Sequence, residues 1–359
     1  MSTNTGSMNL LVQGLFQPGS LGHSPDSMGA ELELIPIRAT SRKRVGIHGR
    51  NQGPGTADVA RDAARGRAWR EEVDSYGAPS WIMPDGGRIC YEPGGQIEIS
   101  SPVFQSAGRL ESFLRSTVSA LRDSAGQAGI TLLTTGVDPY NSLDGVSLEL
   151  QAPRYDAMTR YFDSIGQSGA RMMRQTASLQ VSVELGAHMV DRWALLNALA
   201  PYLVAGYANS PIYAGAPTGY ASYRARLWQT LDSTRTGLPF DKIDPVGAYA
   251  RFASAAGRIV DDDAVHITTL FPEVRPHGYF EIRSMDSMEP DRVGEALRFV
   301  SRIVHNDDVA REAMRVIGNP DPVLLQRAAT LGRLDTVIDE RLNVLERLVA
   351  ESSTGDATD

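Results

Sequence analysis

A short acidic run at residues 91–102 constrains the fold of this chain more than any other stretch of its 359 residues. Its letters, YEPGGQIEISSP, are typical of a strand end, a tight turn built on proline and glycine, and a second strand. Glu92 stands just before the turn, and Glu98 lies on the strand after it. We therefore predict a β-hairpin made of residues 87–91 and 96–101.

Two more acidic strands are predicted far from this hairpin in the sequence. Residues 29–37 alternate so that Glu31 and Glu33 point to one face of a sheet and leucines point to the other. Residues 278–285 carry Glu281 on a similar strand. Carboxylates on one sheet face repel each other unless cations lie between them, and oxygen ligands suit Mg²⁺ or Mn²⁺. The pattern indicates a cation site, although a single strand glutamate is more often solvated surface.

The remaining elements predict the fold class. Further strands are expected at 131–136, 177–185 and 264–270, and helices at 107–128, 191–207, 220–231, 290–304, 308–316 and 322–351. Strands and helices do not alternate as regular β–α–β units. This grouping favours an α+β fold, with an antiparallel β-sheet and helices packed on one face. We expect a flexible N-terminal tail at 1–28 and one domain at 29–359, all helical over about 290–351.

The composition limits the partners that this chain is expected to have. A net charge of −8 argues against nucleic acid or an anionic membrane as a partner, and no apolar run is long enough to span a bilayer. The single cysteine, Cys90, excludes an internal disulfide, and no signal-peptide pattern is present, so we expect a cytoplasmic protein. Lysine occurs only at Lys43 and Lys242, which leaves anion binding mostly to arginine.

Three polar residues on neighbouring stretches extend the candidate site. Gln180 lies on the polar face of the strand predicted at 177–185, and this face either contacts water or continues the acidic surface. Arg275 is presented by a proline-rich loop. Arg283 shares a strand face with Glu281, which indicates either an ordinary ion pair or a cation ligand beside an arginine that binds phosphate or carboxylate.

Other features keep two interpretations each. The segment 40–70, rich in arginine and glycine with a helix from about Thr56, is either a solvated insertion or a flap over an anionic ligand. The arginines of 223–237 are either surface residues or a clamp for a substrate carboxylate. His266 lies on a predicted strand that would face the site. No Walker A, G-x-S-x-G or H-E-x-x-H motif occurs, so a serine hydrolase or a zinc enzyme has little support.

These stretches, in this order, resemble the glutamate–cysteine ligase family, and most closely its plant-type and actinobacterial ergothioneine-pathway branch. The resemblance covers roughly residues 29–290. It rests on GAELE at 29–33, EPGGQIE at 92–98, MMRQT at 172–176, ANSP at 208–211, RLW at 226–228, RTG at 235–237, TTLFPEVR at 268–275 and EIR at 281–283. Residues 284–288 depart from the family pattern, which leaves the identity of the amine substrate open.

The resemblance implies a glutamine-synthetase-like catalytic ligase domain that joins glutamate to cysteine through a γ-glutamyl phosphate. The implied cofactors are ATP and Mg²⁺, with Mn²⁺ as a possible substitute, and the product would serve ergothioneine or glutathione biosynthesis. By motif position the metal ligands would be Glu31, Glu33, Glu92, Glu98 and Glu281. Gln180 would lie beside them, Arg283 and Glu281 would be catalytic, and Arg235 and Arg275 would bind substrate.

Two alternatives to this function remain. The first is a ligase of the same fold that joins glutamate or another acid to a different amine in a biosynthetic pathway. The second is a non-catalytic relative that acts as a binding or scaffold protein. Release of ADP that requires Mg²⁺ and glutamate would separate either ligase from a scaffold.

Overall fold

A computed structural model describes residues 4–19, 24–49 and 53–353. Its centre is a nine-stranded sheet in the order β12-β13-β7-β1-β5-β4-β3-β2, with β6 paired to the second half of β1. All neighbouring strands of this sheet are antiparallel. The strands are β1 Met28–Arg38, β2 Arg70–Val73, β3 Pro79–Ile82, β4 Arg88–Tyr91, β5 Ile97–Ser100, β6 Ile130–Leu133, β7 Ser178–Val183, β12 Val274–Pro276 and β13 Phe280–Asp286.

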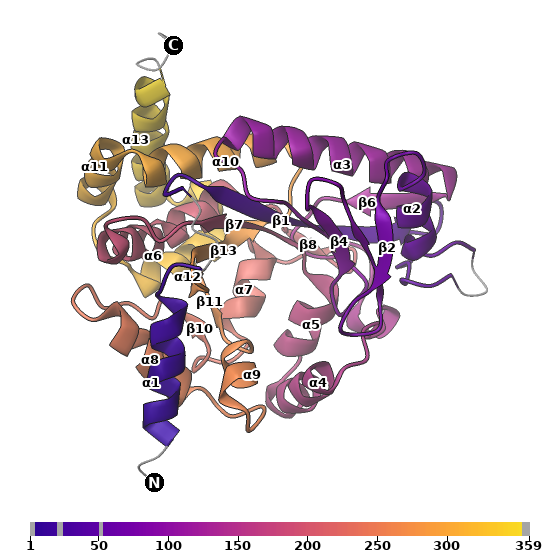
Figure 1. The fold of residues 1–359 in the computed structure, drawn as a ribbon, viewed down its shortest axis with the longest axis horizontal. Helices are drawn as coiled ribbons and strands as arrows, with labels where there is room; N and C mark the ends of the chain where they lie inside the picture. The colour runs from indigo at the N-terminus through magenta and orange to yellow at the C-terminus, as the bar shows by residue number, and fades with distance from the viewer. Residues whose placement is uncertain (1–3, 20–23, 50–52, 354–359) are drawn as a thin grey trace.

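Helices lie on both sides of this sheet (Figure 1). They are α1 Asn4–Leu15, α2 Thr56–Ala63, α3 Ala107–Gln127, α4 Pro153–Ile165, α5 Ser168–Gln175, α6 Met189–Gly206, α7 Tyr223–Gln229, α8 Pro245–Ala255, α9 Asp263–Ile267, α10 Pro290–His305, α11 Asp307–Ile317, α12 Pro322–Leu331 and α13 Thr336–Ser353. In Figure 1, α3 and α10 cover one side, whereas α4, α5 and α7 lie on the other. None of the described helices is long and apolar enough to cross a membrane.

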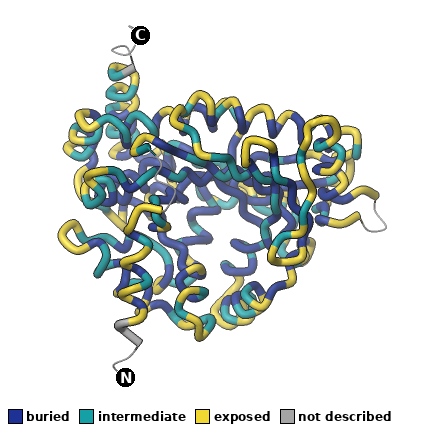
Figure 2. The backbone as a smooth tube through the Cα atoms, in the orientation of Figure 1, coloured by how far each residue is buried: buried dark blue, intermediate teal, exposed yellow. Residues whose placement is uncertain are grey.

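The alternation along β1 explains why the two sides differ. Leu32 and Leu34 are fully buried and belong to the same apolar core as Leu114 of α3 and Leu297 of α10. Burial of one such side chain stabilises the fold by roughly 1.5–3 kcal/mol. Figure 2 shows the sheet as the most continuously buried part of the chain. The core therefore fixes the sheet from one side and leaves the acidic residues of β1 on the other.

The predicted fold class is confirmed, because the structure combines helices with an antiparallel sheet. The predicted hairpin is also confirmed, with Cys90 of β4 paired to Glu98 of β5. The helices α4, α5 and α7 lie over the acidic face of the sheet, so helices cover both faces and not the one face predicted from the sequence.

The prediction of a flexible tail was wrong for the residues that form α1. Met8, Val12 and Phe16 recur at a spacing of four and are buried in the core. The ring of Phe16 packs edge-on against Trp193, with 5.2 Å between ring centroids. The serine, glycine and asparagine residues in and around this stretch hid the apolar stripe. Residues 1–3 and 20–23 of the predicted tail lie outside the described residues.

Two other predicted elements differ from the structure. The strand predicted at 264–270 is wrong: α9 occupies its first half, and Asp262 caps this helix by accepting a hydrogen bond from the Val265 amide. The long helix predicted at 322–351 divides into α12 and α13 around Gly332, whose φ of +55° ends the first helix. Strands β2 and β3 were not predicted, since β2 consists largely of charged, exposed residues.

Candidate active site

Strand pairing brings the predicted acidic residues together on one sheet face. Glu33 and Glu98 are direct partners across β1 and β5, and Glu31 pairs with Gln180 across β1 and β7. One strand further, Glu281 of β13 pairs with a serine of β7. Paired residues of adjacent strands point to the same face. Side chains from distant parts of the sequence therefore meet on the side opposite the core.

Three of the predicted carboxylates converge closely enough to bind one cation. Glu33, Glu92 and Glu98 each offer an oxygen atom, and these atoms lie within 4.8 Å of one another. The amide and hydroxyl of Ser178 orient the Glu33 carboxylate at 2.8 and 3.0 Å. Cys90 donates to Oε1 of Glu98 at 3.0 Å. This is a set of hard oxygen donors of the kind that Mg²⁺ and Mn²⁺ bind.

Burial and mutual repulsion act on the protonation of these groups. Burial, and then the neighbouring Glu92, raise the pKa of Glu33 to about 8. Burial and then Glu281 raise the pKa of Glu31 to about 7. Burial and then Glu31 raise the pKa of Glu98 well above its usual range. The cluster thus retains protons that a divalent ion would replace, and a Mg²⁺ ion fits its donor set and charge.

Glu281 lies in a different electrostatic environment from the other carboxylates. Burial opposes its ionisation, but Arg275 and Arg283 together hold the pKa of Glu281 at about 2. Oε2 of Glu281 is 2.5 Å from Nη1 of Arg283 and 3.3 Å from Nε of Arg275. The guanidinium of Arg283 also lies over the Trp228 ring, 5.0 Å from its centroid. This end of the acidic face therefore carries its own positive charge.

Gln180 connects the two environments. Its Nε2 donates to Oε1 of Glu33 at 3.2 Å, and its Oε1 accepts a hydrogen bond from Nη1 of Arg283. Both ends of the amide are therefore used by residues on either side. The structure places Gln180 between the carboxylates and the arginines, where it orients both.

The glycine-rich turn that carries Glu92 is shaped by close contacts. Gly95 has φ of +76°, which favours glycine. A side chain at Gly94 would place its Cβ 2.2 Å from the carbonyl oxygen of Arg174 in α5. Gln96 donates to the carbonyl of Thr176 at 2.7 Å. The turn is thus pressed against α5 and the start of β7, which fixes its position beside the sheet.

Arg235 does not have the surroundings expected of a substrate ligand. Its side chain is fully buried and donates to Asp232 at 2.8 Å, to the Thr269 carbonyl at 3.0 Å and to the Gly257 carbonyl. Its guanidinium also lies 4.7 Å from the centroid of the Tyr161 ring. These contacts tie loops together and conflict with the expected contact to a substrate carboxylate.

Two other interpretations change with the structure. Arg224 is buried, donates to the Arg283 carbonyl at 2.7 Å and lies 3.9 Å from Asp286, so it supports β13 and is not an open clamp. His266 lies on α9, where Nε2 is 3.2 Å from the Ala253 carbonyl and the ring is buried, in contrast to the predicted strand position. Residues 50–52 of the predicted flap lie outside the described residues.

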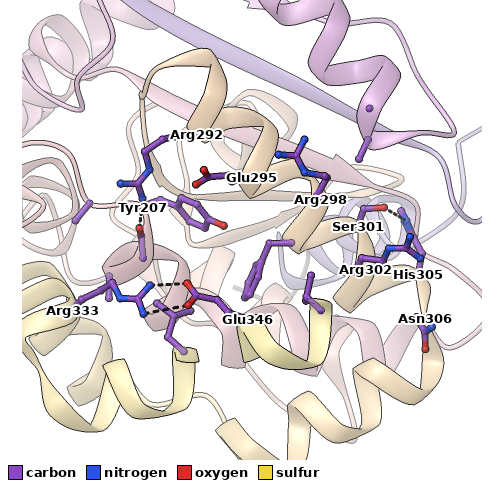
Figure 3. A pocket seen from close by; sticks show the side chains of 18 of the residues that line it. Tyr207, Arg292, Glu295, Arg298, Ser301, Arg302, His305, Asn306, Arg333 and Glu346 are labelled. Atoms are coloured by element: carbon purple, nitrogen blue, oxygen red, sulfur yellow. Dashed lines mark hydrogen bonds and ion pairs between the residues drawn. The ribbon is translucent and has the colours of Figure 1, made fainter. Parts of the chain in front are cut away.

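A cavity of about 1300 Å³ lies away from the acidic residues, among α6, α10 and α13 (Figure 3). Although arginines line it, they already have partners. Arg333 binds Glu346 at 2.6 Å, and Arg292 donates to the Gly206 carbonyl at 2.7 Å. Because its charges are largely balanced within the protein, this cavity is a weaker candidate for an active site than the acidic sheet face.

Comparison with known proteins decides the family. Residues 28–332 match the family model described as glutamate–cysteine ligase family 2. The chain belongs to this family. The family resemblance seen in the sequence is therefore confirmed.

Relatives within the glutamate–cysteine ligases are bacterial and plant proteins. The chain is 33% identical over 309 residues to "Glutamate--cysteine ligase EgtA" of Mycolicibacterium smegmatis, which covers 75% of this chain and 72% of that one. It is 29% identical over 258 residues to the chloroplastic glutamate–cysteine ligase of Arabidopsis thaliana, and covers 49% of that protein. A solved glutamate–cysteine ligase of Francisella tularensis in complex with AMP aligns with a TM-score of 0.49 and 12% identity, covering 91% of this chain and 82% of that one.

Proposed function

We propose that this chain is an ATP-dependent glutamate–cysteine ligase that acts on small-molecule substrates and uses Mg²⁺. The γ-carboxylate of glutamate attacks the γ-phosphorus of ATP, which forms γ-glutamyl phosphate and releases ADP. The cysteine amine then attacks the acyl carbon, phosphate leaves, and the amine gives up a proton. The observation that carries this proposal is the meeting of Glu33, Glu92 and Glu98 beside an arginine-bound Glu281.

The residues divide into two roles in this reaction. Those proposed to hold Mg²⁺ are Glu31, Glu33, Glu92, Glu98 and Glu281. Bound Mg²⁺ would supply positive charge against the triphosphate. Arg283 and Arg275 would neutralise the transferred phosphoryl group and the glutamate carboxylate from the other side. Such neutralisation and positioning suit phosphoryl transfer, which needs no covalent nucleophile from the protein.

The contacts of Arg235 and Gln180 refine the roles expected from the family motif. We assign Arg235 to the support of loops near the site, because its guanidinium is enclosed by protein. Gln180 is assigned to orientation of Glu33 and Arg283. A non-catalytic scaffold is the weaker alternative, since burying several repelling carboxylates costs folding free energy that only a cation would recover.

A direct test is to incubate the protein with ATP, Mg²⁺, glutamate and each of the amino acids in turn. ADP formation should require Mg²⁺ and glutamate, and cysteine should give a product with the mass of γ-glutamylcysteine. Glu281→Gln should abolish ADP formation. Glu71→Gln is a matched control, because Glu71 is an exposed strand glutamate whose ion-pair partner among the described residues is Arg61. Absence of ADP with every amine would contradict the proposal, and another coupled amine would reassign the second substrate.

A further inference from the structure

We propose that Arg44 is a positioning residue that holds Glu92 in the cation site. The segment of residues 44–47, which follows β1, would thereby govern metal affinity. This inference rests on the proposed function, because it assumes that the carboxylates bind a divalent ion. Arg44 itself contacts the backbone of the turn of residues 92–95, and its described partners are protein atoms. Its effect would therefore be transmitted through the backbone of that turn.

The guanidinium of Arg44 binds the turn directly. Its side chain is only 5% exposed, and Nη2 donates to the Gly94 carbonyl at 2.8 Å, two residues after Glu92. The same nitrogen lies 3.5 Å from the Arg174 carbonyl at the end of α5. Nη1 lies 3.6 Å from the carboxylate of Asp138. Arg44 therefore bridges the turn to α5, with a buried counter-ion behind it.

A second contact links the same segment to the turn. The amide of Glu149 donates to the Pro93 carbonyl at 2.7 Å, and its carboxylate accepts from the Ile47 amide at 3.3 Å. Ile47 follows Arg44 by three residues. The segment thus reaches the turn both directly through Arg44 and indirectly through Glu149. Among the described residues, no side chain other than that of Arg44 donates a hydrogen bond to the backbone of residues 92–95.

The turn needs this support because of what Glu92 faces. Its internal hydrogen bonds, from the Glu92 amide to the Gln96 carbonyl and from the Gly95 amide to the Glu92 carbonyl, fix its shape. Both bonds lie within residues 92–96, so they do not tie the turn to α5. When they are ionised, Glu33 and Glu98 repel the Glu92 carboxylate and push it out of the site unless a cation lies between the three groups. A hydrogen bond from a charged donor such as Arg44 is stronger than one between neutral groups, and it opposes this displacement.

Manganese binding tests this role without relying on activity. We would measure the dissociation constant of Mn²⁺ by electron paramagnetic resonance for the wild type, Arg44→Lys and Arg44→Ala. Since lysine keeps the charge but loses the planar fork, Arg44→Lys should weaken Mn²⁺ binding about tenfold, as expected for a residue that orients a ligand. Gly94→Ala should give a similar loss, because its methyl group would displace the same turn from the Arg174 carbonyl.

Arg38, the last residue of β1, provides a matched control close to this segment. It also donates to backbone carbonyls, those of Pro54 at 2.6 Å and Ala128 at 3.5 Å, but makes no contact with the turn. Arg38→Ala should therefore lower thermal stability and leave the Mn²⁺ dissociation constant within about twofold of wild type. If Arg44 has a purely structural role, Arg44→Lys should likewise lower thermal stability and leave Mn²⁺ affinity near wild type. That result would overturn the proposal.

The Glu92→Gln background separates the proposed route from other routes. If Arg44 acts through Glu92, Arg44→Lys should cause no further loss of Mn²⁺ affinity in Glu92→Gln. An equal loss in both backgrounds would contradict this route. A wild-type protein that binds Mn²⁺ but forms no ADP would contradict the proposed function, whereas unchanged Mn²⁺ affinity in Arg44→Lys would contradict only the role of Arg44.

Discussion

The two ends of the acidic sheet face balance their charge in opposite ways. The carboxylate end, defined as Glu31, Glu33, Glu92 and Glu98, has raised pKa values of about 7 for Glu31 and about 8 for Glu33. The arginine end, defined as Glu281, Arg275 and Arg283, contains a carboxylate whose pKa is about 2. Glu33 and Glu98 at one end are as deeply buried as Glu281 and Arg283 at the other, so the difference comes from the neighbours and not from solvent.

This difference shows how one sheet can serve two kinds of charge. The carboxylate end lacks positive charge of its own and is ready to receive a cation from solution. The arginine end already contains its cations and is ready for an anion. Gln180 joins the two through Glu33 and Arg283, which fixes their separation. Mutations at the carboxylate end should consequently act mainly on cation affinity, and mutations at the arginine end mainly on the rate of ADP formation.

The largest effect is expected for Arg283→Lys at the arginine end. The rate of ADP formation should fall on the order of 10³-fold, because lysine cannot contact Glu281, Gln180 and a phosphoryl group together. Affinity for Mn²⁺ should change far less, since the three converging carboxylates of Glu33, Glu92 and Glu98 are all kept. Steady-state kinetics and Mn²⁺ titration check the two halves of this prediction. Equal losses in the rate of ADP formation and in Mn²⁺ affinity would contradict separate roles for the two ends.

At the carboxylate end, Glu98→Gln should act mainly on Mn²⁺ affinity, in contrast to Arg283→Lys. Mn²⁺ affinity should fall at least about tenfold, because one of three converging oxygens loses its charge. The metal-free protein should become more stable at pH 8, since repulsion with Glu31 is relieved. Titration with Mn²⁺ and thermal unfolding without metal provide the measurements. A variant with unchanged Mn²⁺ affinity would exclude Glu98 as a ligand.

Arg235→Lys tests an arginine that belongs to neither end. Loss of its contacts to Asp232, Thr269 and Gly257 should lower the free energy of unfolding by about 2–4 kcal/mol. The KM for glutamate should stay close to wild type, because the guanidinium is enclosed. Urea unfolding and glutamate titration measure these quantities. A large rise in KM with unchanged stability would restore Arg235 as a substrate ligand.

The stability of the metal-free protein should depend on pH. Glu31 and Glu33 have an ordinary pKa of 4.5 and folded values of about 7 and about 8, so the folded state binds protons more tightly than the unfolded state. The folding stability that these two groups contribute by binding protons is fully present below pH 4.5 and is lost as the pH rises toward 8. We expect the metal-free Tm to fall by a few degrees, on the order of 5 °C, between pH 6 and pH 8.

Saturating Mg²⁺ should remove most of this loss, because the ion replaces the protons. Differential scanning calorimetry at both pH values, with Mg²⁺ and with a chelator, gives the comparison. An identical pH dependence in the two conditions would show that the carboxylates are not cation ligands.

The smallest effect is expected for Cys90→Ser. A serine hydroxyl can still donate to Glu98, so Mn²⁺ affinity should remain within about twofold of wild type. Burial, and then Glu98, raise the pKa of the Cys90 thiol well above its usual range. The thiol should therefore react with iodoacetamide far more slowly than an unfolded-chain cysteine at pH 8. A rate equal to that of the denatured protein would contradict the shielding of this half-buried thiol.

The sequence predicted the acidic strands well because their signal is local. Alternation along β1 assigned Glu31 and Glu33 to one face without knowledge of the partner strands. The proline and glycine residues after Glu92 predicted the hairpin for the same reason. The family motif then connected these strands to a ligase, which the family match confirms.

The features that were missed depend on tertiary contacts. α1 is stabilised by burial of Val12 and Phe16 against distant residues, and its own letters carry little helical signal. The enclosure of Arg235 depends on the Gly257 and Thr269 carbonyls, which are brought to it by folding. The support that Arg44 gives to the turn likewise follows from chain packing, and no local pattern indicates it.

The central claim is that a divalent ion binds between Glu33, Glu92 and Glu98. Crystals grown with Mn²⁺ and a non-hydrolysable ATP analogue would test it by anomalous scattering at the manganese edge. We expect an anomalous peak bound by oxygen atoms of these three side chains, with the analogue's phosphates between that peak and Arg283. Strong Mn²⁺ peaks elsewhere on the protein, with no peak at the three carboxylates, would contradict the account.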